Sequence, residues 1–430
     1  MSEVIVVLGS QWGDEGKGKI VDLFAKNCDL VCRCQGGNNA GHTVIVNDQT
    51  YFFHLIPSGL VNRNSTALIG NGVVVHIPSL FKEINECISK GLEDAASRLL
   101  VSDRCHIVFD FHIKIDEIEE IMRGNSSIGT TKRGIGPAYS HKVGRHGLRI
   151  GDLIYDWENF VIKYGELLNF VKKLYPSIEF DDVKELEALK NYRTKLESMV
   201  CDTTTYISTY LKDANKKILV EGAQSSLLDI DFGTYPYVTS SSCSIGGVCT
   251  GLGLPPKRIS SVYGVMKAYT TRVGNGVFPT EINGELAEHI RTKGHEYGVT
   301  TKRPRRVGWL DCTLLNYSKL INGYDAMGLT KLDILDELDE VKIATAYRNK
   351  ETSEPIIGNP ITTKGMCDSI DVQYITLPGW KKPTTNITVF DQLPEEAKTY
   401  IQTIESLIGI PIKWIGTGPC RDAIIHRHNS

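Results

Sequence analysis

The sequence lacks long apolar runs, an excess of one charge, and paired cysteines. Even a clear apolar run such as Val4–Leu8 is far shorter than the roughly 20 residues that span a bilayer. The 48 Lys and Arg nearly balance the 51 Asp and Glu, and the net charge is −3. No global field therefore favours a nucleic acid or an anionic membrane, and any basic site must be local.

Cysteine usage excludes a disulfide-rich framework. The eleven cysteines are scattered from Cys28 to Cys420 without a Cys-x-x-Cys spacing, and the closest pair, Cys32 and Cys34, lies in apolar sequence. We expect buried, reduced thiols rather than a zinc site. The N-terminal residues lack the basic region and the small-residue cleavage site of a secretory signal, so we expect a cytoplasmic protein.

The pattern of short apolar strands and helical segments predicts an α/β fold with a large, mostly parallel central sheet flanked by helices. A small antiparallel hairpin is expected at 43–55, and a charged amphipathic helix at 181–200 is expected to face solvent. Because no repeat or linker is present, we expect one domain over 1–430, with an inserted lobe of helices and loops at roughly 100–215. The other expected strands are Val4–Leu8, Leu30–Cys34, Thr66–Ile69, Ile218–Val220, Val262–Met266 and Ala326–Leu332, and the other expected helices are Lys19–Lys26, Ser79–Gly91 and Thr313–Gly323.

A glycine-rich run, Gly9–Lys19 (GSQWGDEGKGK), connects a predicted strand to a predicted helix. Its four glycines let backbone amides approach an anion, and Lys17 adds a cation, so we predict a P-loop-like phosphate site. The run departs from the Walker pattern, because six residues separate Gly9 from Gly16 and Gly18 replaces the usual Ser or Thr. Asp14 is then a possible metal ligand or base. The alternative is an ordinary glycine-rich turn.

A second glycine-rich segment, Gln35–Thr43 (QGGNNAGHT), follows the second predicted strand. Open α/β sheets bind ligands at the carboxyl ends of their strands, so we expect this segment to share the phosphate site. A lone histidine is more often structural, but the setting of His42 favours a role in the site.

Two segments are locally basic. The stretch from Gly124 to Gly151 contains cations, hydroxyls and glycines but no Asp or Glu, which suits a phosphorylated small molecule. A nucleic-acid-binding loop is the alternative there. The segment Thr300–Arg306 (TTKRPRR) places four cations within five positions. It suits a carboxylate or phosphate, and a targeting signal is the alternative.

The segment Thr330–Asp333 closes another predicted strand. An Asp there can accept hydrogen bonds from guanine while a Lys stem packs on the ring, although a surface charge pair is equally consistent. A switch GTPase is disfavoured, because the nearby Asp-x-x-Gly at Asp325–Gly328 lies too close to Thr330.

Taken together, these residues resemble the adenylosuccinate synthetases over essentially the whole chain. The resemblance rests on Gln11–Gly18 (QWGDEGKG) and on Gly134–Tyr139 (GIGPAY) followed by Lys142 and Arg145. The segments Glu221–Gln224 and Tyr235–Ser241 are also similar. The resemblance implies a GTP-binding α/β fold and a ligase (EC 6.3.4.4) that joins IMP and L-aspartate through a 6-phosphoryl-IMP intermediate, in the first committed step of AMP synthesis. GTP hydrolysis to GDP and phosphate drives that reaction.

The same resemblance implies roles for individual residues. Asp14 would remove the N1 proton of IMP, His42 would hydrogen-bond to the transferred phosphoryl group, and Lys17 and Gln224 complete the catalytic set. Mg²⁺ would be bound by Asp14 and the Gly41 carbonyl. A homodimer is implied, with Arg145 reaching the IMP phosphate of the neighbouring subunit. The implied GTP-binding residues are Gly13, Glu15, Gly16, Lys17, Gly18, Lys19, Gly41, His42, Thr43, Arg305, Lys331, Asp333, Gly416, Thr417 and Gly418; those for IMP are Asp14, Asn39, Thr130, Thr131, Arg145, Gln224, Thr239 and Arg303; and those for L-aspartate are Val299, Thr300, Thr301, Arg303 and Arg305.

The sequence departs from the family at Lys302, where Gly is common, and at Cys420, where an acidic or polar residue is usual. Two other classes compete with a ligase. A GTP-regulated binding protein would retain GTP without chemistry that depends on IMP. A nucleotide-cofactor oxidoreductase is disfavoured, because the first loop lacks Gly-x-Gly-x-x-Gly.

Overall fold

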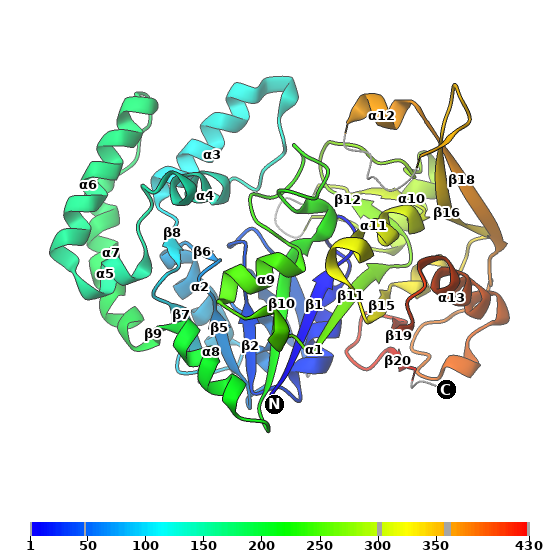
Figure 1. Cartoon of the computed structure of the whole chain (residues 1–430), viewed down its shortest axis with the longest axis horizontal. Coiled ribbons are helices and arrows are strands. Elements are labelled where there is room, and N and C mark those ends of the chain that lie inside the picture. The colour runs from blue at the N-terminus through cyan, green and yellow to red at the C-terminus, as the bar shows by residue number, and fades with distance from the viewer. Residues whose placement is uncertain (1, 47–48, 299–302, 357–362, 428–430) are drawn as a thin grey trace. The chain divides into compact units, whose positions relative to one another are not determined.

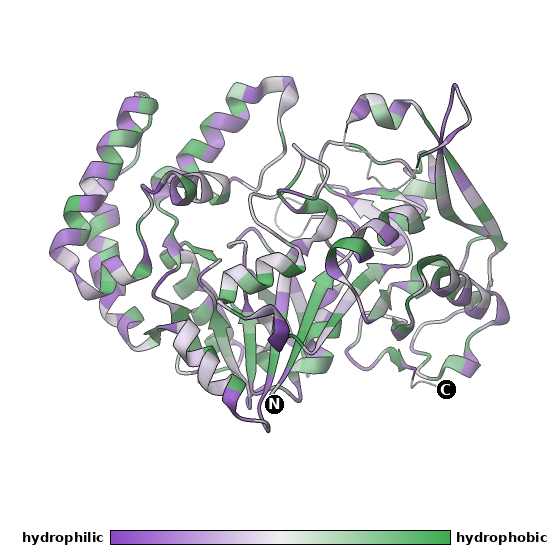
Figure 2. Ribbon diagram, viewed as in Figure 1, coloured by the Kyte–Doolittle hydropathy of each residue, from purple (hydrophilic) through white to green (hydrophobic). Residues whose placement is uncertain are grey.

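The computed structural model describes residues 2–46, 49–298, 303–356 and 363–427. Its central sheet has ten strands in the order β20-β19-β15-β11-β1-β10-β2-β5-β7-β9. The printed neighbour pairs run parallel except at the edge, where β20 is antiparallel to β19. The α/β fold with a large, mostly parallel sheet is therefore confirmed. Figure 2 shows several of its strands in green, because buried parallel strands carry apolar residues on both faces.

The chain divides into two compact units, Met1–Ile5 with Phe24–Ala223 and Thr239–Ser260, and Val6–Leu23 with Gln224–Val238 and Ser261–Ser430. We call them unit 1 and unit 2. The expectation of a single domain stays a prediction.

Unit 1 is built on parallel strands followed by a group of helices. Helices α5, α6 and α7 lie side by side (Figure 1). A large hydrophobic core joins strands of the unit to this helical group, and its residues run from Val44 to Met199. The strands are β2 (Leu30–Arg33), β3 (His42–Val46), β4 (Gln49–Phe53), β5 (Thr66–Ile69), β6 (Val74–Val75), β7 (Leu99–Ser102), β8 (His106–Ile107), β9 (Val200–Cys201) and most of β10 (Lys217–Ser225), and the helices are α2 (Ile77–Ser89), α3 (Asp110–Arg123), α4 (Ile135–Gly144), α5 (Ile150–Tyr155), α6 (Trp157–Leu174), α7 (Asp182–Leu196), α8 (Thr203–Lys212) and α9 (Ile245–Leu252).

Unit 2 contains the glycine-rich loop, most of β1, and the four strands of the central sheet that come late in the chain, β11, β15, β19 and β20. A separate ribbon of β16 and β18 packs beside helix α11. The strands are β1 (Glu3–Gly9, from Val6), β11 (Ser261–Lys267), β12 (Thr270–Arg272), β13 (Arg306–Gly308), β14 (Leu310–Asp311), β15 (Ala326–Thr330), β16 (Glu340–Asn349), β17 (Pro355–Ile356), β18 (Ile370–Pro378), β19 (Ile412–Gly416) and β20 (Ile424–His426), and the helices are α1 (Lys17–Ala25), α10 (Glu285–Lys293), α11 (Cys312–Asn322), α12 (Lys364–Asp368) and α13 (Glu395–Ile408).

The expected elements are found with small differences. Strand β15 ends two residues before the predicted end, because Lys331 has a φ of 58° and the chain turns into a short 3-10 helix. The hairpin of β3 and β4 is antiparallel as predicted. Helix α7 buries Glu185 and Leu189 on one face, so it faces solvent on its other side only.

All eleven cysteines are unpaired, and seven are buried, so the expectation of buried, reduced thiols is confirmed for seven and is wrong about burial for the other four. Cys420 is the one exposed thiol. Within the described ranges, no helix is both long and apolar enough to cross a membrane.

Candidate active site

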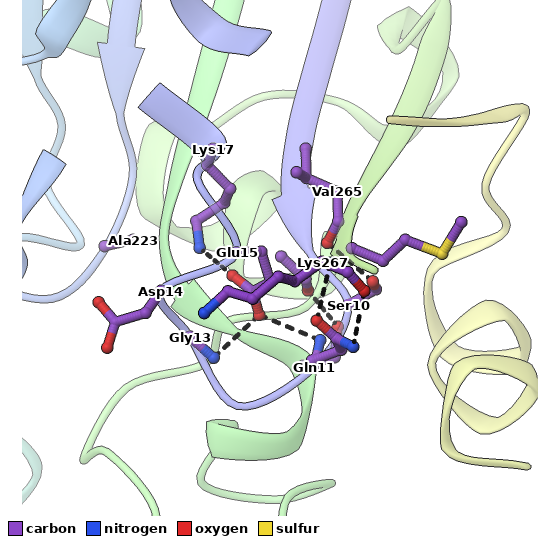
Figure 3. Close-up of polar contacts among 12 residues, drawn as sticks. Ser10, Gln11, Gly13, Asp14, Glu15, Lys17, Ala223, Val265 and Lys267 are labelled. Atoms are coloured by element: carbon purple, nitrogen blue, oxygen red, sulfur yellow. Dashed lines mark hydrogen bonds and ion pairs between the residues drawn. The ribbon is translucent and has the colours of Figure 1, made fainter. Parts of the chain in front are cut away.

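The glycine-rich loop lies between β1, which ends at Gly9, and α1, which begins at Lys17. Its backbone turns through three residues with positive φ: Gly13 at 86°, Asp14 at 58° and Gly16 at 77°. Asp14 is not a glycine, and a left-handed conformation at such a residue is uncommon enough to suggest a function. Figure 3 shows this loop and the polar contacts that hold it.

Glu15 holds the loop from within. Its Oε1 accepts hydrogen bonds from the backbone amides of Gln11 at 3.1 Å and Gly13 at 2.9 Å, and its Oε2 pairs with Lys17 Nζ at 2.6 Å. Burial alone would raise the pKa of Glu15, but the Lys17 ammonium outweighs burial and the pKa is lowered. A charged carboxylate and ammonium therefore lie together under the loop.

Asp14 points its carboxylate toward a cluster of buried charges in unit 2. Its Oδ2 lies 2.8 Å from Arg305 Nε, and Arg305 Nη1 donates to Glu296 Oε2 at 2.7 Å. Glu296 Oε1 also accepts from Lys267 Nζ and Lys331 Nζ, each at 2.8 Å. The structure thus brings together three predicted residues, Asp14, Arg305 and Lys331.

This cluster contains two residues that sequence reasoning missed. Burial lowers the pKa of Lys267 to about 8, although Glu296 opposes this shift. Burial alone would raise the pKa of Glu296, but the three surrounding cations hold it well below its usual value. The available signal was a lysine ending the apolar strand at 261–267 and a glutamate just before the basic loop.

The residues predicted to enclose guanine also gather in unit 2. Lys19 Nζ donates to the carbonyls of Gly418 at 2.7 Å and Ala423 at 2.6 Å, which fixes the loop after β19 beside α1. Burial lowers the pKa of Lys19 to about 8, although the nearby Asp333 carboxylate acts to raise it. Burial raises the pKa of Asp333. The predicted Gly416 and Thr417 belong to the same segment, and Thr417 Oγ1 donates to the Ile387 carbonyl at 2.8 Å.

In unit 1, the second glycine-rich segment delivers His42 to the first position of β3. His42 Nδ1 contacts Glu221 Oε1, and Glu221 Oε2 accepts from the Ser58 amide at 2.7 Å and hydroxyl at 2.9 Å. Glu221 is fully buried in the apolar strand β10. Its carboxylate orients the imidazole and selects the ring nitrogen that carries the proton. Sequence reasoning noted Glu221 only as part of a resembling segment.

The other predicted residues of this segment line the same turn. Asn39 Oδ1 accepts from the Gly37 amide at 3.1 Å, and Gln35 Nε2 donates to the Ala223 carbonyl at 2.6 Å. Gly41 has open space where a Cβ would lie, and Thr43 is exposed. Backbone oxygens and amides are therefore accessible around Gly41.

Five of the eight predicted IMP residues lie in unit 1, and the other three, Asp14, Gln224 and Arg303, lie in unit 2. The Thr130 amide donates to Glu120 Oε2 at 3.2 Å, and Thr131 follows it at the surface. Arg145 is exposed just after α4 with a φ of 63°. Thr239 Oγ1 in unit 1 and Gln224 Oε1 in unit 2 are buried without a hydrogen-bond partner among the described residues, which suits polar atoms that meet a ligand.

Of the loop predicted to bind L-aspartate, the structure describes the stem. Val299, Thr300 and Thr301, with Lys302, lie outside the described residues. Arg303 is exposed, and its carbonyl accepts from the Gly298 amide at 2.8 Å. The stem places Arg305 against Asp14, whereas the described part of the chain contains no cluster of three or more His, Cys, Asp or Glu suited to a metal.

Comparisons with known proteins show the family of the chain. The adenylosuccinate synthetase family model matches residues 6–425. The chain is 58% identical to the adenylosuccinate synthetase of Schistosoma japonicum, over 99% of this chain and 98% of that protein. It is 52% identical to that of Drosophila mojavensis, over 99% of this chain and 95% of the relative.

Among solved structures, the fully ligated adenylosuccinate synthetase of Plasmodium falciparum superposes with a TM-score of 0.95 at 46% identity. The match covers 99% of this chain and all of the other. The chain therefore belongs to the adenylosuccinate synthetase family, the ligases that join IMP to L-aspartate with GTP.

Proposed function

We propose that Asp14, His42 and Lys17 carry the phosphoryl-transfer half of this ligation. The observation that supports the proposal best is the loop after β1, where Asp14 is held in a left-handed conformation beside Arg305 while Lys17 lies under the same loop. A carboxylate and a cation on one anion-binding loop are the groups that proton removal and phosphate binding require.

The chemistry follows from the poor leaving ability of the 6-oxo group of IMP. Asp14 removes the N1 proton, so that O6 becomes nucleophilic and attacks the γ-phosphorus of GTP. The bond from that phosphorus to the β,γ-bridging oxygen breaks and GDP leaves. The amine of L-aspartate then attacks C6 of the 6-phosphoryl-IMP, and phosphate departs.

His42 donates a hydrogen bond to the phosphoryl group in transit. Its contact with Glu221 supports this role, because a carboxylate on Nδ1 holds the imidazole in one tautomer and one orientation. Lys17 stabilises negative charge on the GTP phosphates, and Gln224 orients the purine.

Binding of the three substrates is divided among loops of both units. The buried oxygens of Thr239 and Gln224, which have no hydrogen-bond partner among the described residues, support an IMP site, and the contacts of Lys19 and Asp333 support a guanine site. The remaining GTP residues are Gly13, Glu15, Gly16, Gly18, Gly41, Thr43, Arg305, Lys331, Gly416, Thr417 and Gly418; the remaining IMP residues are Asn39, Thr130, Thr131, Arg145 and Arg303; and the aspartate residues are Val299, Thr300, Thr301, Arg303 and Arg305.

The family uses a metal cofactor, and we propose that the metal is Mg²⁺. Asp14 would hold it with a carboxylate oxygen and Gly41 with its carbonyl, which are the hard oxygen donors that Mg²⁺ prefers. Among the described residues no three His, Cys, Asp or Glu gather around a metal, which fits an ion that completes its shell with water and substrate phosphates. When bound, Mg²⁺ neutralises charge on those phosphates.

We also propose a cytoplasmic homodimer in which Arg145 binds the IMP phosphate of the partner subunit. The exposed Arg145, in a turn that presents it outward after α4, supports this assignment.

Ultraviolet difference absorption tests the proposed reaction. The purine spectrum is expected to change only with IMP, GTP, L-aspartate and Mg²⁺ together. Asp14→Asn, which keeps a residue that tolerates the left-handed backbone, is expected to fold and to lose roughly 10²- to 10⁴-fold in turnover. Wild-type-like turnover in Asp14→Asn would contradict the assignment of the base.

A further inference from the structure

The buried carboxylate of Glu296 joins two binding loops to a common centre. Its side chain has 0% of its surface exposed, and it contacts Arg305, Lys331 and Lys267 at 2.7 to 2.8 Å. The Tyr269 hydroxyl donates to Glu296 Oε1 at 2.5 Å, and this oxygen also accepts from Lys267 and Lys331. Four donors on one carboxylate fill most of the positions that its two oxygens offer.

The charges of this cluster do not balance internally. Lys267, Lys331 and Arg305 supply three positive charges, while Glu296 and Asp14 supply two negative ones. Lys331 is the most exposed of the three cations, with 30% of its side chain accessible, whereas Arg305 and Lys267 are buried. The surplus positive charge suits an anionic substrate, and Glu296 prevents the three cations from repelling one another.

Glu296 also anchors the stem of the basic loop through the backbone. The Arg305 amide donates to the Glu296 carbonyl at 2.9 Å, and the Gly298 amide donates to the Arg303 carbonyl at 2.8 Å. Residues 296–298 and 303–305 therefore run side by side, with an antiparallel bridge between Tyr297 and Pro304. One residue thus fixes both the backbone and the guanidinium of Arg305.

The contact with Lys331 reaches a second loop. Lys331 Nζ donates to Glu296 Oε1 and, at 2.6 Å, to the Gly294 carbonyl, so its ammonium is held by the turn after α10. Lys331 has a φ of 58° and begins the turn that presents Asp333. The position of Lys331 in the guanine-binding turn therefore depends on the segment around Glu296.

We propose that Glu296 is a positioning residue that holds Arg305 for L-aspartate and Lys331 for the guanine base through a single buried carboxylate. The inference rests on the proposed roles of Arg305 and Lys331. Glu296 touches no substrate, because its side chain is fully enclosed. Its loss impairs L-aspartate and GTP together and affects IMP less, because five of the eight residues proposed for IMP lie in unit 1.

The test is the set of three Michaelis constants of Glu296→Gln, which removes the charge and keeps the shape. The KM values for L-aspartate and GTP are expected to rise roughly tenfold to a hundredfold, as for loss of a charged hydrogen bond. The KM for IMP and kcat are expected to change much less. Glu296→Asp, which restores the charge at a shorter reach, is expected to give intermediate values.

A second pair of variants separates positioning from stability. Asp311→Asn alters another buried carboxylate of unit 2, which accepts hydrogen bonds from Tyr347 and the first turn of α11. It is expected to lower the unfolding temperature without changing any KM. The double variant Glu296→Gln with Lys267→Met removes one buried cation with the carboxylate, so the unfolding temperature recovers while the KM values for L-aspartate and GTP stay raised.

The possible results either support or overturn the inference. If the double variant restores both KM values, or if Glu296→Gln alters neither, Glu296 only balances charge and the inference is wrong. If Glu296→Gln does not fold, the double variant decides alone: raised KM values for L-aspartate and GTP support the inference, and wild-type values overturn it. Arg305→Leu tests the proposed aspartate site itself. If this variant leaves the KM for L-aspartate unchanged, both the assignment of Arg305 to L-aspartate and the inference about Glu296 are wrong.

Discussion

At the scale of the residue, the proposed site pairs side chains assigned to substrate with buried carboxylates that place them, and both partners of each pair are buried. Glu15 holds Lys17, Glu221 holds His42, and Glu296 holds Arg305. The groups that meet substrate stand in local motifs, where glycine spacing and charge reveal them. The carboxylates were harder to predict, since Glu221 and His42 lie 179 positions apart and only the fold brings them together.

The first prediction concerns the pair of His42 and Glu221. In Glu221→Gln, the amide cannot enforce the same tautomer or stabilise a charged imidazole, so kcat is expected to fall about 100-fold or more. Steady-state rates at saturating substrates measure this effect. Ser58→Ala is the matched control, because it removes one hydrogen bond to the same carboxylate and is expected to leave kcat within a few-fold. Equal losses in both variants would refute the orienting role.

At the scale of the element, the connection from β1 to α1 is fixed by close packing as well as by charge. A Cβ at Gly9 would lie 2.6 Å from Glu15 Oε2 and 2.8 Å from Lys17 Nζ. The sequence correctly predicted a glycine-rich loop between this strand and this helix. It did not reveal that Gly9 is needed for the internal ion pair rather than for approach to a ligand.

We therefore predict that Gly9→Ala folds but displaces Glu15 and Lys17, which raises the Kd for GTP roughly tenfold or more. Isothermal titration calorimetry measures this constant. Gly165→Ala is the control, since Gly165 lies on α6 with no atom within 4 Å of the added Cβ. It is expected to stabilise the helix by about 0.5 to 1 kcal/mol and to leave GTP binding unchanged. Unaltered GTP affinity in Gly9→Ala would contradict the packing argument.

Helix α7 shows where periodicity misjudges an element. Its charge pattern suggests a solvated helix, yet Glu185 is buried and accepts hydrogen bonds from Tyr164 and the Asp110 amide, each at 2.6 Å. Burial raises the pKa of Glu185 to about 7. Sequence alone cannot show which glutamate of such a helix faces the core.

The raised pKa predicts a pH dependence of stability. The folded state binds the Glu185 proton more tightly than the unfolded state, so this stabilising contribution is complete below pH 4.5 and is lost as the pH rises to about 7. The loss amounts to about 3 kcal/mol. Glu185→Gln cannot titrate, and urea unfolding at pH 5 and pH 8 is expected to show a smaller decrease in stability for it than for wild type. Identical decreases would disprove the shift.

At the scale of the whole molecule, the residues proposed for the reaction and its substrates are found in both units. Unit 2 holds Asp14, Lys17 and Arg305, whereas unit 1 holds His42 and Arg145. The order of the strands could be anticipated only as a mostly parallel sheet, because the pairing of β10 with β2 joins segments far apart in the chain. The division into two units left no composition shift in the sequence.

The proposed sharing of Arg145 between subunits predicts complementation. Arg145→Leu and Asp14→Ala are each expected to be nearly inactive alone. Mixed in equal amounts and allowed to exchange subunits, they form dimers with one intact site in half of the population, so activity is expected to recover to about a quarter of wild type. Activity no greater than the sum of the two separate variants would argue against a shared site.

The central claim is that the 6-oxo oxygen of IMP leaves as part of phosphate. Turnover of IMP carrying a heavy oxygen isotope at O6, followed by mass spectrometry of the released phosphate, tests it most directly. The mechanism predicts that each phosphate carries the labelled oxygen. Unlabelled phosphate, released while labelled IMP is converted to product, would contradict it.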